Sequence, residues 1–202
     1  MAILELGHIR LATGLESSDA TVLQKLLTVK QGIEAYSGLP TYFYQQVDDS
    51  SMLFVFGAWS SKDSHQHGYN GSPQQTQTLA SVKDQMTIDW MQYMDIDHES
   101  LPVHAPVLGL IKETLPKHVN KTAFDQNFAE VTQNLGGARY GAVSAWNLRK
   151  DKHEPDIRVH FSGWESIDEA MTAMIDIIEH AEGFQVKPTS LNILFATPIN
   201  LD

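Results

Sequence analysis

The chain has 202 residues, enough for one domain or two small ones, and either can bury a core. It carries 14 Lys and Arg against 25 Asp and Glu, and the net charge of −11 has the wrong sign for binding nucleic acid. It contains no Cys, which excludes disulfides, thiolate catalysis and Cys-based metal sites. It shows neither a signal peptide nor a long apolar stretch, so we expect a cytoplasmic protein with no membrane partner.

One pattern occurs twice along the chain. Residues 52–61 alternate like a strand up to Trp59 and end on Ser61, and residues 157–166 do the same up to Trp164 and Ser166. In both copies the Ser could cap a following helix. This repetition predicts a duplicated unit, which we place at residues 1–101 and 102–202.

The first half predicts a strand at residues 4–11, a helix that ends at Gly38, and two strands at 41–47 and 52–59. A short helical stretch, a helix from Pro73 to about Met86 and a strand at 89–97 follow. The second half predicts a strand at 107–115, a helix ended by Gly136 and Gly137, strands at 138–148 and 156–164 around a turn at 150–155, a helix at 166–182 and a strand at 191–199.

Each half therefore has the β-α-β-β-α-β order of the ferredoxin-like unit. One such half covers only one face of its sheet with helices, so a second half is needed to cover the other face. We predict an α+β protein in which two tandem ferredoxin-like repeats form a pseudo-dimeric, eight-stranded α+β barrel. A cavity between the two half-sheets would be the site for a small molecule.

The two Trp strands differ in the chemistry of their faces. One face is apolar in both copies, as expected for packing on helices: Met52, Phe54 and Phe56, then Ile157, Val159 and Phe161. The other face changes between the copies, from Leu53, Val55, Gly57 and Trp59 to Arg158, His160, Ser162 and Trp164. We expect this second face to line the cavity. Alternatively, Arg158 pairs with a carboxylate and His160 is a packed core histidine, because buried polar groups are usually paired.

Further histidines are candidates for the site. His8 lies opposite Leu110 in the repeat, which suggests a general base or hydrogen-bond donor, with a packed histidine as the alternative. His65 and His67 follow Trp59, but positions i and i+2 of a helix diverge, so we expect no metal site. The predicted catalytic residues are His160, Arg158 and His8, and the predicted substrate-binding residues are Trp59, Trp164, Ser162, Val55, His65, His67 and Tyr69.

The run of Trp59, Ser61, His65, His67, Ser72 and Pro73 resembles the Trp-x-Ser…His…Ser-Pro stretch of antibiotic biosynthesis monooxygenase domains. That family belongs to the dimeric α+β barrel superfamily, and this chain would be a tandem fusion of two such domains. The resemblance implies an enzyme of secondary metabolism, because members oxidise polyketide phenols without flavin or metal. It also implies Trp and Arg in the cavity, which Trp59, Trp164 and Arg158 could supply.

We therefore predict oxygenation, without a cofactor, of a small hydrophobic or aromatic metabolite of polyketide type. His160 or His8 would remove a phenolic proton, Arg158 would stabilise the anion, and the carbanion-like substrate would react with dioxygen. Three alternatives stay open: a cyclase or isomerase that uses the same base without oxygen, a non-catalytic ligand-binding barrel, and a haem enzyme. The sequence also leaves open whether the fused barrel forms a homodimer.

Overall fold

The structure is a computed structural model that describes residues 2–117, 119–132, 138–148, 154–180 and 186–201. The predicted helix end at Gly136 and Gly137 and most of the predicted turn at 150–155 lie outside these residues. The chain forms two compact units. Unit 1 contains Met1–Glu99 and Ala196–Asp202, and unit 2 contains Ser100–Phe195.

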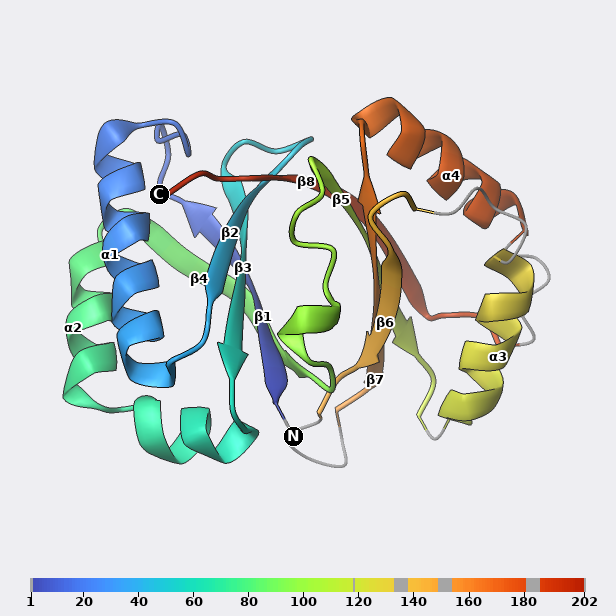
Figure 1. Cartoon of the computed structure of the whole chain (residues 1–202), viewed down its shortest axis with the longest axis horizontal. Coiled ribbons are helices and arrows are strands. Elements are labelled where there is room, and N and C mark those ends of the chain that lie inside the picture. The colour runs from blue at the N-terminus through green and yellow to red at the C-terminus, as the bar shows by residue number, and fades with distance from the viewer. Residues whose placement is uncertain (1, 118, 133–137, 149–153, 181–185, 202) are drawn as a thin grey trace. The chain divides into compact units, whose positions relative to one another are not determined.

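Unit 1 is a ferredoxin-like unit with one additional short helix. Its elements are β1 (Ile3–Leu11), α1 (Ala20–Ser37), β2 (Thr41–Gln46), β3 (Met52–Trp59), η1 (Ser64–Tyr69), α2 (Pro73–Val82) and β4 (Met86–Met94). The antiparallel strands lie in the order β4-β1-β3-β2, and α1 and α2 lie side by side (Figure 1). Gly38 ends α1 with a left-handed φ of 70°, and the Ser72 side chain caps α2 by accepting from the Gln75 amide.

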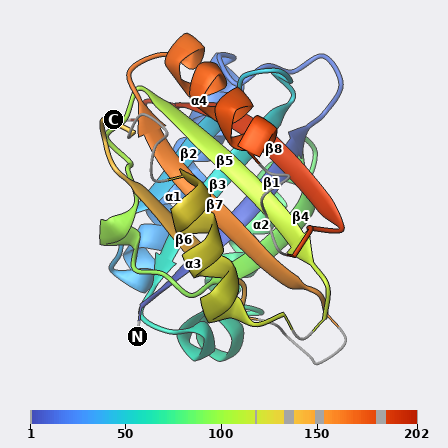
Figure 2. The ribbon, with the colours of Figure 1, turned by 90° about the vertical axis from the view of Figure 1, so that its right-hand side faces the viewer.

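Unit 2 repeats this arrangement without the additional helix in its described residues. After the short η2 (His98–Ser100) its elements are β5 (Val107–Leu115), α3 (Lys121–Thr132), β6 (Ala142–Trp146), β7 (Asp156–Trp164), α4 (Ile167–His180) and β8 (Ser190–Pro198). Their order is β8-β5-β7-β6, equivalent to the order in unit 1. Figure 2 shows α3 and α4 over the strands of this unit. The predicted α+β fold with two tandem ferredoxin-like repeats is confirmed.

The eight strands form one antiparallel sheet in the order β4-β1-β3-β2-β8-β5-β7-β6. Residues 196–198 of β8 pair with β2, where Ala196 lies opposite Gln46. The predicted closure into a barrel is wrong for the part of the chain that the structure describes, because the strand order is open and ends at β4 and β6. The pairing of β2 with β8 joins one edge strand of each repeat. Among the described residues, the outer edges of β4 and β6 have no partner strand.

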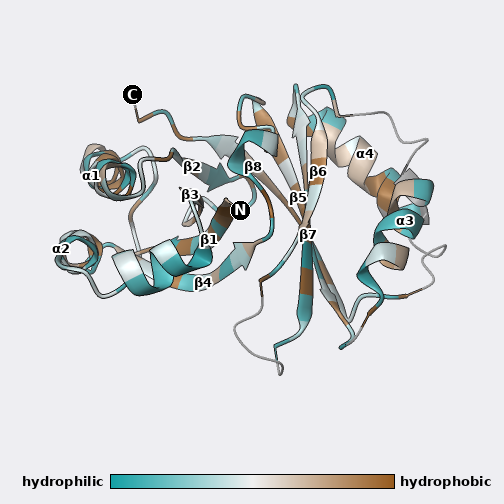
Figure 3. Ribbon diagram, turned by 60° about the horizontal axis from the view of Figure 1, so that its bottom comes forward, coloured by the Kyte–Doolittle hydropathy of each residue, from teal (hydrophilic) through white to brown (hydrophobic). Residues whose placement is uncertain are grey.

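Each unit has an apolar core between its sheet and its helices. In unit 1 the core includes Val22 and Leu26 of α1, packed on Leu53 and Val55 of β3. In unit 2 it is built from β5, β7, α3 and α4. Figure 3 shows apolar residues in the strands of both units and in α4. No helix among the described residues is long and apolar enough to cross a lipid bilayer.

Candidate active site

The two faces of the Trp strands are the reverse of the sequence prediction. In β3, Leu53 and Val55 pack under α1 in the core of unit 1. In β7, the guanidinium carbon of Arg158 lies 3.9 Å from the ring centroid of Phe128 in α3, and the His160 ring lies 5.0 Å from it. The residues expected to line a cavity between half-sheets therefore lie under the helices of their own unit.

The prediction of which strand face the helices cover is wrong because both faces of the sheet are buried in each unit. Phe54 and Phe56 point away from the helices and are 0% and 1% exposed, and Phe161 in β7 is 0% exposed. An apolar strand face therefore does not identify the side that the helices cover. Polar side chains can lie under a helix when other polar groups pair with them, since pairing offsets the cost of burial.

Glu5 and Trp59 form the centre of a polar cluster in unit 1. They lie on β1 and β3 and are 6% and 1% exposed. The Trp59 indole Nε1 donates a hydrogen bond to Glu5 Oε2 at 2.9 Å. Gly57 lies opposite Glu5 in the strand pairing, and a Cβ there would be only 3.3 Å from the indole nitrogen and 3.4 Å from Glu5 Oε2. The glycine therefore leaves room for this bond.

The π-helix η1 places His65 against the same carboxylate. Helices of this type are rare and are frequent at functional sites. His65 Nε2 lies 3.3 Å from Glu5 Oε1, and Nδ1 lies 2.5 Å from the Tyr93 hydroxyl. Burial lowers the pKa of His65 to about 4 and raises the pKa of Tyr93 to about 12. Both side chains are therefore neutral at neutral pH.

Aromatic rings connect His65 to the surface of unit 1. The Trp59 ring lies 4.4 Å from the His65 ring, and Tyr69 lies 5.1 Å from Trp59. Tyr36 of α1 lies 5.1 Å from Tyr69. Tyr69 is 4% exposed, whereas Tyr36 is 40% exposed. These rings pack on one another and form an aromatic cluster that reaches the surface at Tyr36.

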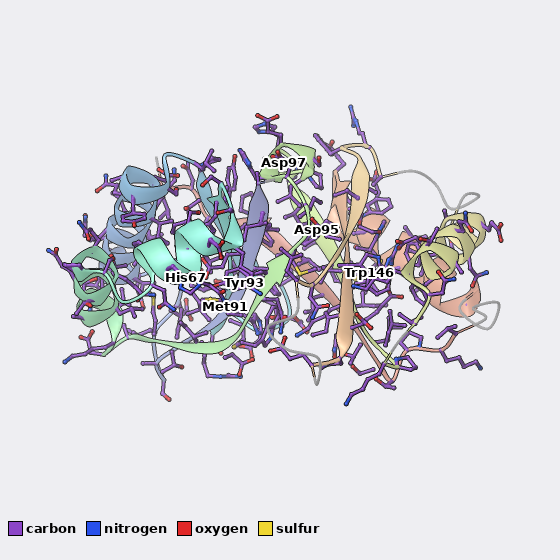
Figure 4. The ribbon with its side chains drawn as sticks, turned by 90° about the horizontal axis from the view of Figure 1, so that it is seen from below. His67, Met91, Tyr93, Asp95, Asp97 and Trp146 are labelled. Carbon is purple, nitrogen blue, oxygen red and sulfur yellow. The ribbon has the colours of Figure 1, made fainter. Side chains whose placement is uncertain are left out.

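Of the predicted substrate-binding residues, Trp59, His65 and Tyr69 come together in this cluster. His67 does not join them: its side chain is exposed on η1, 4.0 Å from Asp63, so the two histidines diverge as predicted. Figure 4 shows His67 on η1, and Tyr93 on β4. Val55 lies in the apolar core instead.

Arg158 is the centre of a second buried cluster, in unit 2. Its Nη1 donates to Glu113 Oε2 at 2.7 Å, its Nε to Asp125 Oδ1 at 2.8 Å and its Nη2 to Ser144 Oγ at 2.7 Å. Burial raises the pKa of Glu113, and the charge of Arg158 opposes this shift. This is the carboxylate pairing that the sequence left open as the alternative. A role for Arg158 in stabilising a substrate anion stays a prediction.

His160 belongs to the same cluster, because its Nδ1 lies 3.0 Å from Ser144 Oγ. Burial, reinforced by Arg158, lowers the pKa of His160 to about 3. Next along β7, the Trp164 indole donates to Ser162 Oγ at 2.8 Å, and Ser162 donates to the Gly109 carbonyl at 3.3 Å. Trp164 therefore bonds to a hydroxyl where Trp59 bonds to a carboxylate.

His8 lies on the face of β1 opposite to the Glu5 cluster. Its Nε2 is 2.8 Å from Gln46 Oε1, its Nδ1 is 3.2 Å from Asp89 Oδ2, and its ring stacks on Phe54 at 4.7 Å. It is 8% exposed. The structure thus shows a packed, hydrogen-bonded histidine, and its role as a general base stays a prediction.

Sequence analysis did not identify Glu5 and Tyr93. When Leu6 is aligned with Leu108, Glu5 falls opposite Val107, a charge in one repeat and an apolar residue in the other. That is the same signal that selected His8, so Glu5 could have been found. Tyr93 carries no such signal, because its partner His65 is distant in sequence.

No protein-family model matches the sequence, and no curated protein matches it. Solved structures match over nearly the whole chain. An anthrone oxidase-like protein is 13% identical, with 98% of this chain and 92% of that chain covered and a TM-score of 0.63. A mutant chlorite dismutase from Candidatus Nitrospira defluvii is 11% identical, with coverages of 100% and 92% and a TM-score of 0.62. A haem-binding protein from Thermus thermophilus is 8% identical, with coverages of 99% and 91% and a TM-score of 0.61.

The chain shares the fold of these proteins. At such identities the likeness shows the fold alone, and the chemistry has to be argued from the two clusters.

Proposed function

We propose that unit 1 carries the active site of a small-molecule oxidative enzyme that acts on an aromatic substrate. The observation that carries this proposal is a buried, neutral His65 held between the Tyr93 hydroxyl and the Glu5 carboxylate, beside the rings of Trp59 and Tyr69. A neutral imidazole can accept a proton, and aromatic walls suit a flat substrate. The likeness in fold to an anthrone oxidase-like protein also supports the proposal of an oxidative enzyme that acts on an aromatic substrate.

The reaction that fits this site is oxygenation without an added cofactor, as in antibiotic biosynthesis monooxygenases. An activated CH2 group of a phenolic, polyketide-like substrate loses a proton, which ends on His65. The carbanion passes one electron to dioxygen, and the two radicals combine to form a peroxide anion. The imidazolium returns its proton to this anion, and loss of water leaves a ketone. One dioxygen thus gives one ketone and one water. Secondary metabolism and a cytoplasmic location stay predictions.

The test is oxygen uptake with anthrone-type probes, compared between wild type, His65→Gln and a control, His104→Gln, in an exposed residue of the link between the repeats. We expect one dioxygen per ketone formed. Loss of a general base lowers kcat by about 10²–10⁴-fold, so His65→Gln should do so while His104→Gln has no effect. Product formation without oxygen would replace this proposal by a cyclase or isomerase. Tight binding of the probes without turnover would replace it by a ligand-binding protein.

A haem does not fit the histidines of the two clusters. His65 has both ring nitrogens directed at protein groups, Tyr93 and Glu5. His160 has Nδ1 at Ser144 and its ring against Phe128, next to the charged Arg158. We therefore derive no step through haem. Titration with hemin should give no shifted Soret band, and a sharp shifted band at one equivalent would contradict this.

A further inference from the structure

We infer that Glu5 fixes which nitrogen of His65 carries the proton, and that the hydroxyl oxygen of Tyr93 is therefore the atom that takes the proton of the substrate. This inference rests on the proposed function and adds a catalytic residue and a positioning residue to it. Neither Glu5 nor Tyr93 belongs to the motif on which the sequence resemblance was based.

The first step concerns Nε2 of His65. Glu5 uses Oε2 to accept from the Trp59 indole, and its Oε1 lies 3.3 Å from Nε2. With Glu5 ionised, which this inference requires, Oε1 can only accept a hydrogen bond, so the neutral ring would carry its hydrogen on Nε2. Trp59 holds the carboxylate in place, because the indole nitrogen can only donate.

The second step concerns Nδ1. With the hydrogen on Nε2, Nδ1 presents a lone pair, and the Tyr93 hydroxyl, 2.5 Å away, donates to it. The lone pairs of the Tyr93 oxygen then point away from His65. A hydrogen bond from Gln66 to this oxygen opposes the burial that raises the pKa of Tyr93. The phenolate that would form for a moment therefore has a donor already in place.

These assignments give a proton path with a defined direction. The substrate proton goes to the Tyr93 oxygen as the Tyr93 proton goes to His65 Nδ1, which leaves a neutral Tyr93 and an imidazolium. The imidazolium lies 3.3 Å from the Glu5 carboxylate, which offsets the cost of placing a cation in a buried site. His65 alone does not offer this path, because both its ring nitrogens are directed at protein groups, Nδ1 at Tyr93 and Nε2 at Glu5.

Tyr93 is itself buried, at 6% exposed. The Lys62 ammonium is 5.7 Å from its ring centroid. The described residues of unit 2 hold no equivalent of this path, since Val107 replaces Glu5 and the Trp164 indole bonds to Ser162. The inferred path therefore belongs to unit 1.

The positioning role of Glu5 can be tested without a substrate, from the ¹⁵N signals of the nine histidine rings. The signals of His65 are identified by their loss in His65→Gln. We expect a neutral His65 with its hydrogen on Nε2 in wild type and in Glu16→Gln, an exposed control. In Glu5→Gln the new amide turns its oxygen to Trp59 and its NH2 to Nε2, so the hydrogen should move to Nδ1. A wild-type hydrogen on Nδ1, or no change in Glu5→Gln, would overturn the inference.

Tyr93 is tested by turnover of a probe that wild type oxidises. We expect Tyr93→Phe to lower kcat by about 10²–10⁴-fold with a similar KM, as for loss of a general base, while the surface variant Tyr140→Phe has no effect. An unchanged kcat in Tyr93→Phe overturns the role of Tyr93. If Glu5→Gln does not fold, the inference is still tested by the tautomer of His65 in wild type and by the kcat of Tyr93→Phe. If wild type oxidises no probe while the tautomer is as expected, the proposed function fails and the positioning of His65 by Glu5 stands.

Discussion

The indole of Trp59 donates a hydrogen bond to the carboxylate of Glu5 at 2.9 Å, and both side chains are almost completely buried. The equivalent indole, that of Trp164, donates to Ser162 Oγ at 2.8 Å. The same strand position is thus used differently in the two units. In unit 1 the indole holds a carboxylate that also contacts a histidine, whereas in unit 2 it is satisfied by a neutral neighbour.

This difference predicts unequal effects of two matched substitutions. Trp59→Phe removes the donor from a buried carboxylate, and leaving a buried acceptor unsatisfied costs about 1–3 kcal/mol, or more for a charged group. Trp164→Phe leaves only Ser162, which still donates to the Gly109 carbonyl. We therefore expect Trp59→Phe to lower the free energy of unfolding in urea more than Trp164→Phe. Equal losses would show that the Glu5 bond contributes no more than the Ser162 bond.

Arg158 predicts a strong non-additive effect. Arg158→Met leaves Glu113 buried with no cation, and removal of one partner of a buried ion pair costs about 3–5 kcal/mol. The double variant Arg158→Met with Glu113→Gln removes both charges, so we expect it to be more stable than Arg158→Met alone. Urea unfolding of the wild type, both single variants and the double variant gives the coupling energy. A coupling energy near zero would contradict the buried pair.

His65 predicts a pH dependence of stability with a defined sign. Burial lowers its pKa from the ordinary 6.5 to about 4, so between these values the unfolded chain binds a proton that the folded chain does not. Stability is therefore lost as pH falls from about 6.5 towards 4. His65→Gln removes this contribution, and its free energy of unfolding should fall less than that of wild type between neutral pH and about pH 5. Parallel curves would mean that His65 titrates equally in both states.

His8 predicts an effect on stability rather than on turnover. His8→Leu leaves the Oε1 of the buried Gln46 without its donor at 2.8 Å, which should cost about 1–3 kcal/mol. Asp89 is half exposed, and water can replace its contact. We expect kcat and KM close to those of wild type on any accepted probe. A large fall in kcat with normal stability would instead support the predicted role of His8 as a general base.

The sequence predicted the order of helices and strands in both repeats, because alternation and helical periodicity are local properties. It also predicted that His65 and His67 diverge. It did not predict which strand face the helices cover, since period two shows only which residues share a face. Phe54 and Phe161 are as buried as any residue under the helices. Their apolar character therefore did not show which face of the sheet the helices cover. For a related reason the sequence did not predict which residues pair within the site. Glu5 and His65, or Arg158 and Asp125, meet only through tertiary structure.

Strand β8 has a consequence for the order of assembly. Its first part belongs to unit 2, whereas residues 196–198 belong to unit 1, where they pair with β2. During synthesis the earlier residues of unit 1 leave the ribosome long before this partner does, so β2 has an open edge for the whole time that unit 2 is being made. An unpaired strand edge can pair with another extended chain, and cutting the gene between the repeats would leave the β2 edge unpaired.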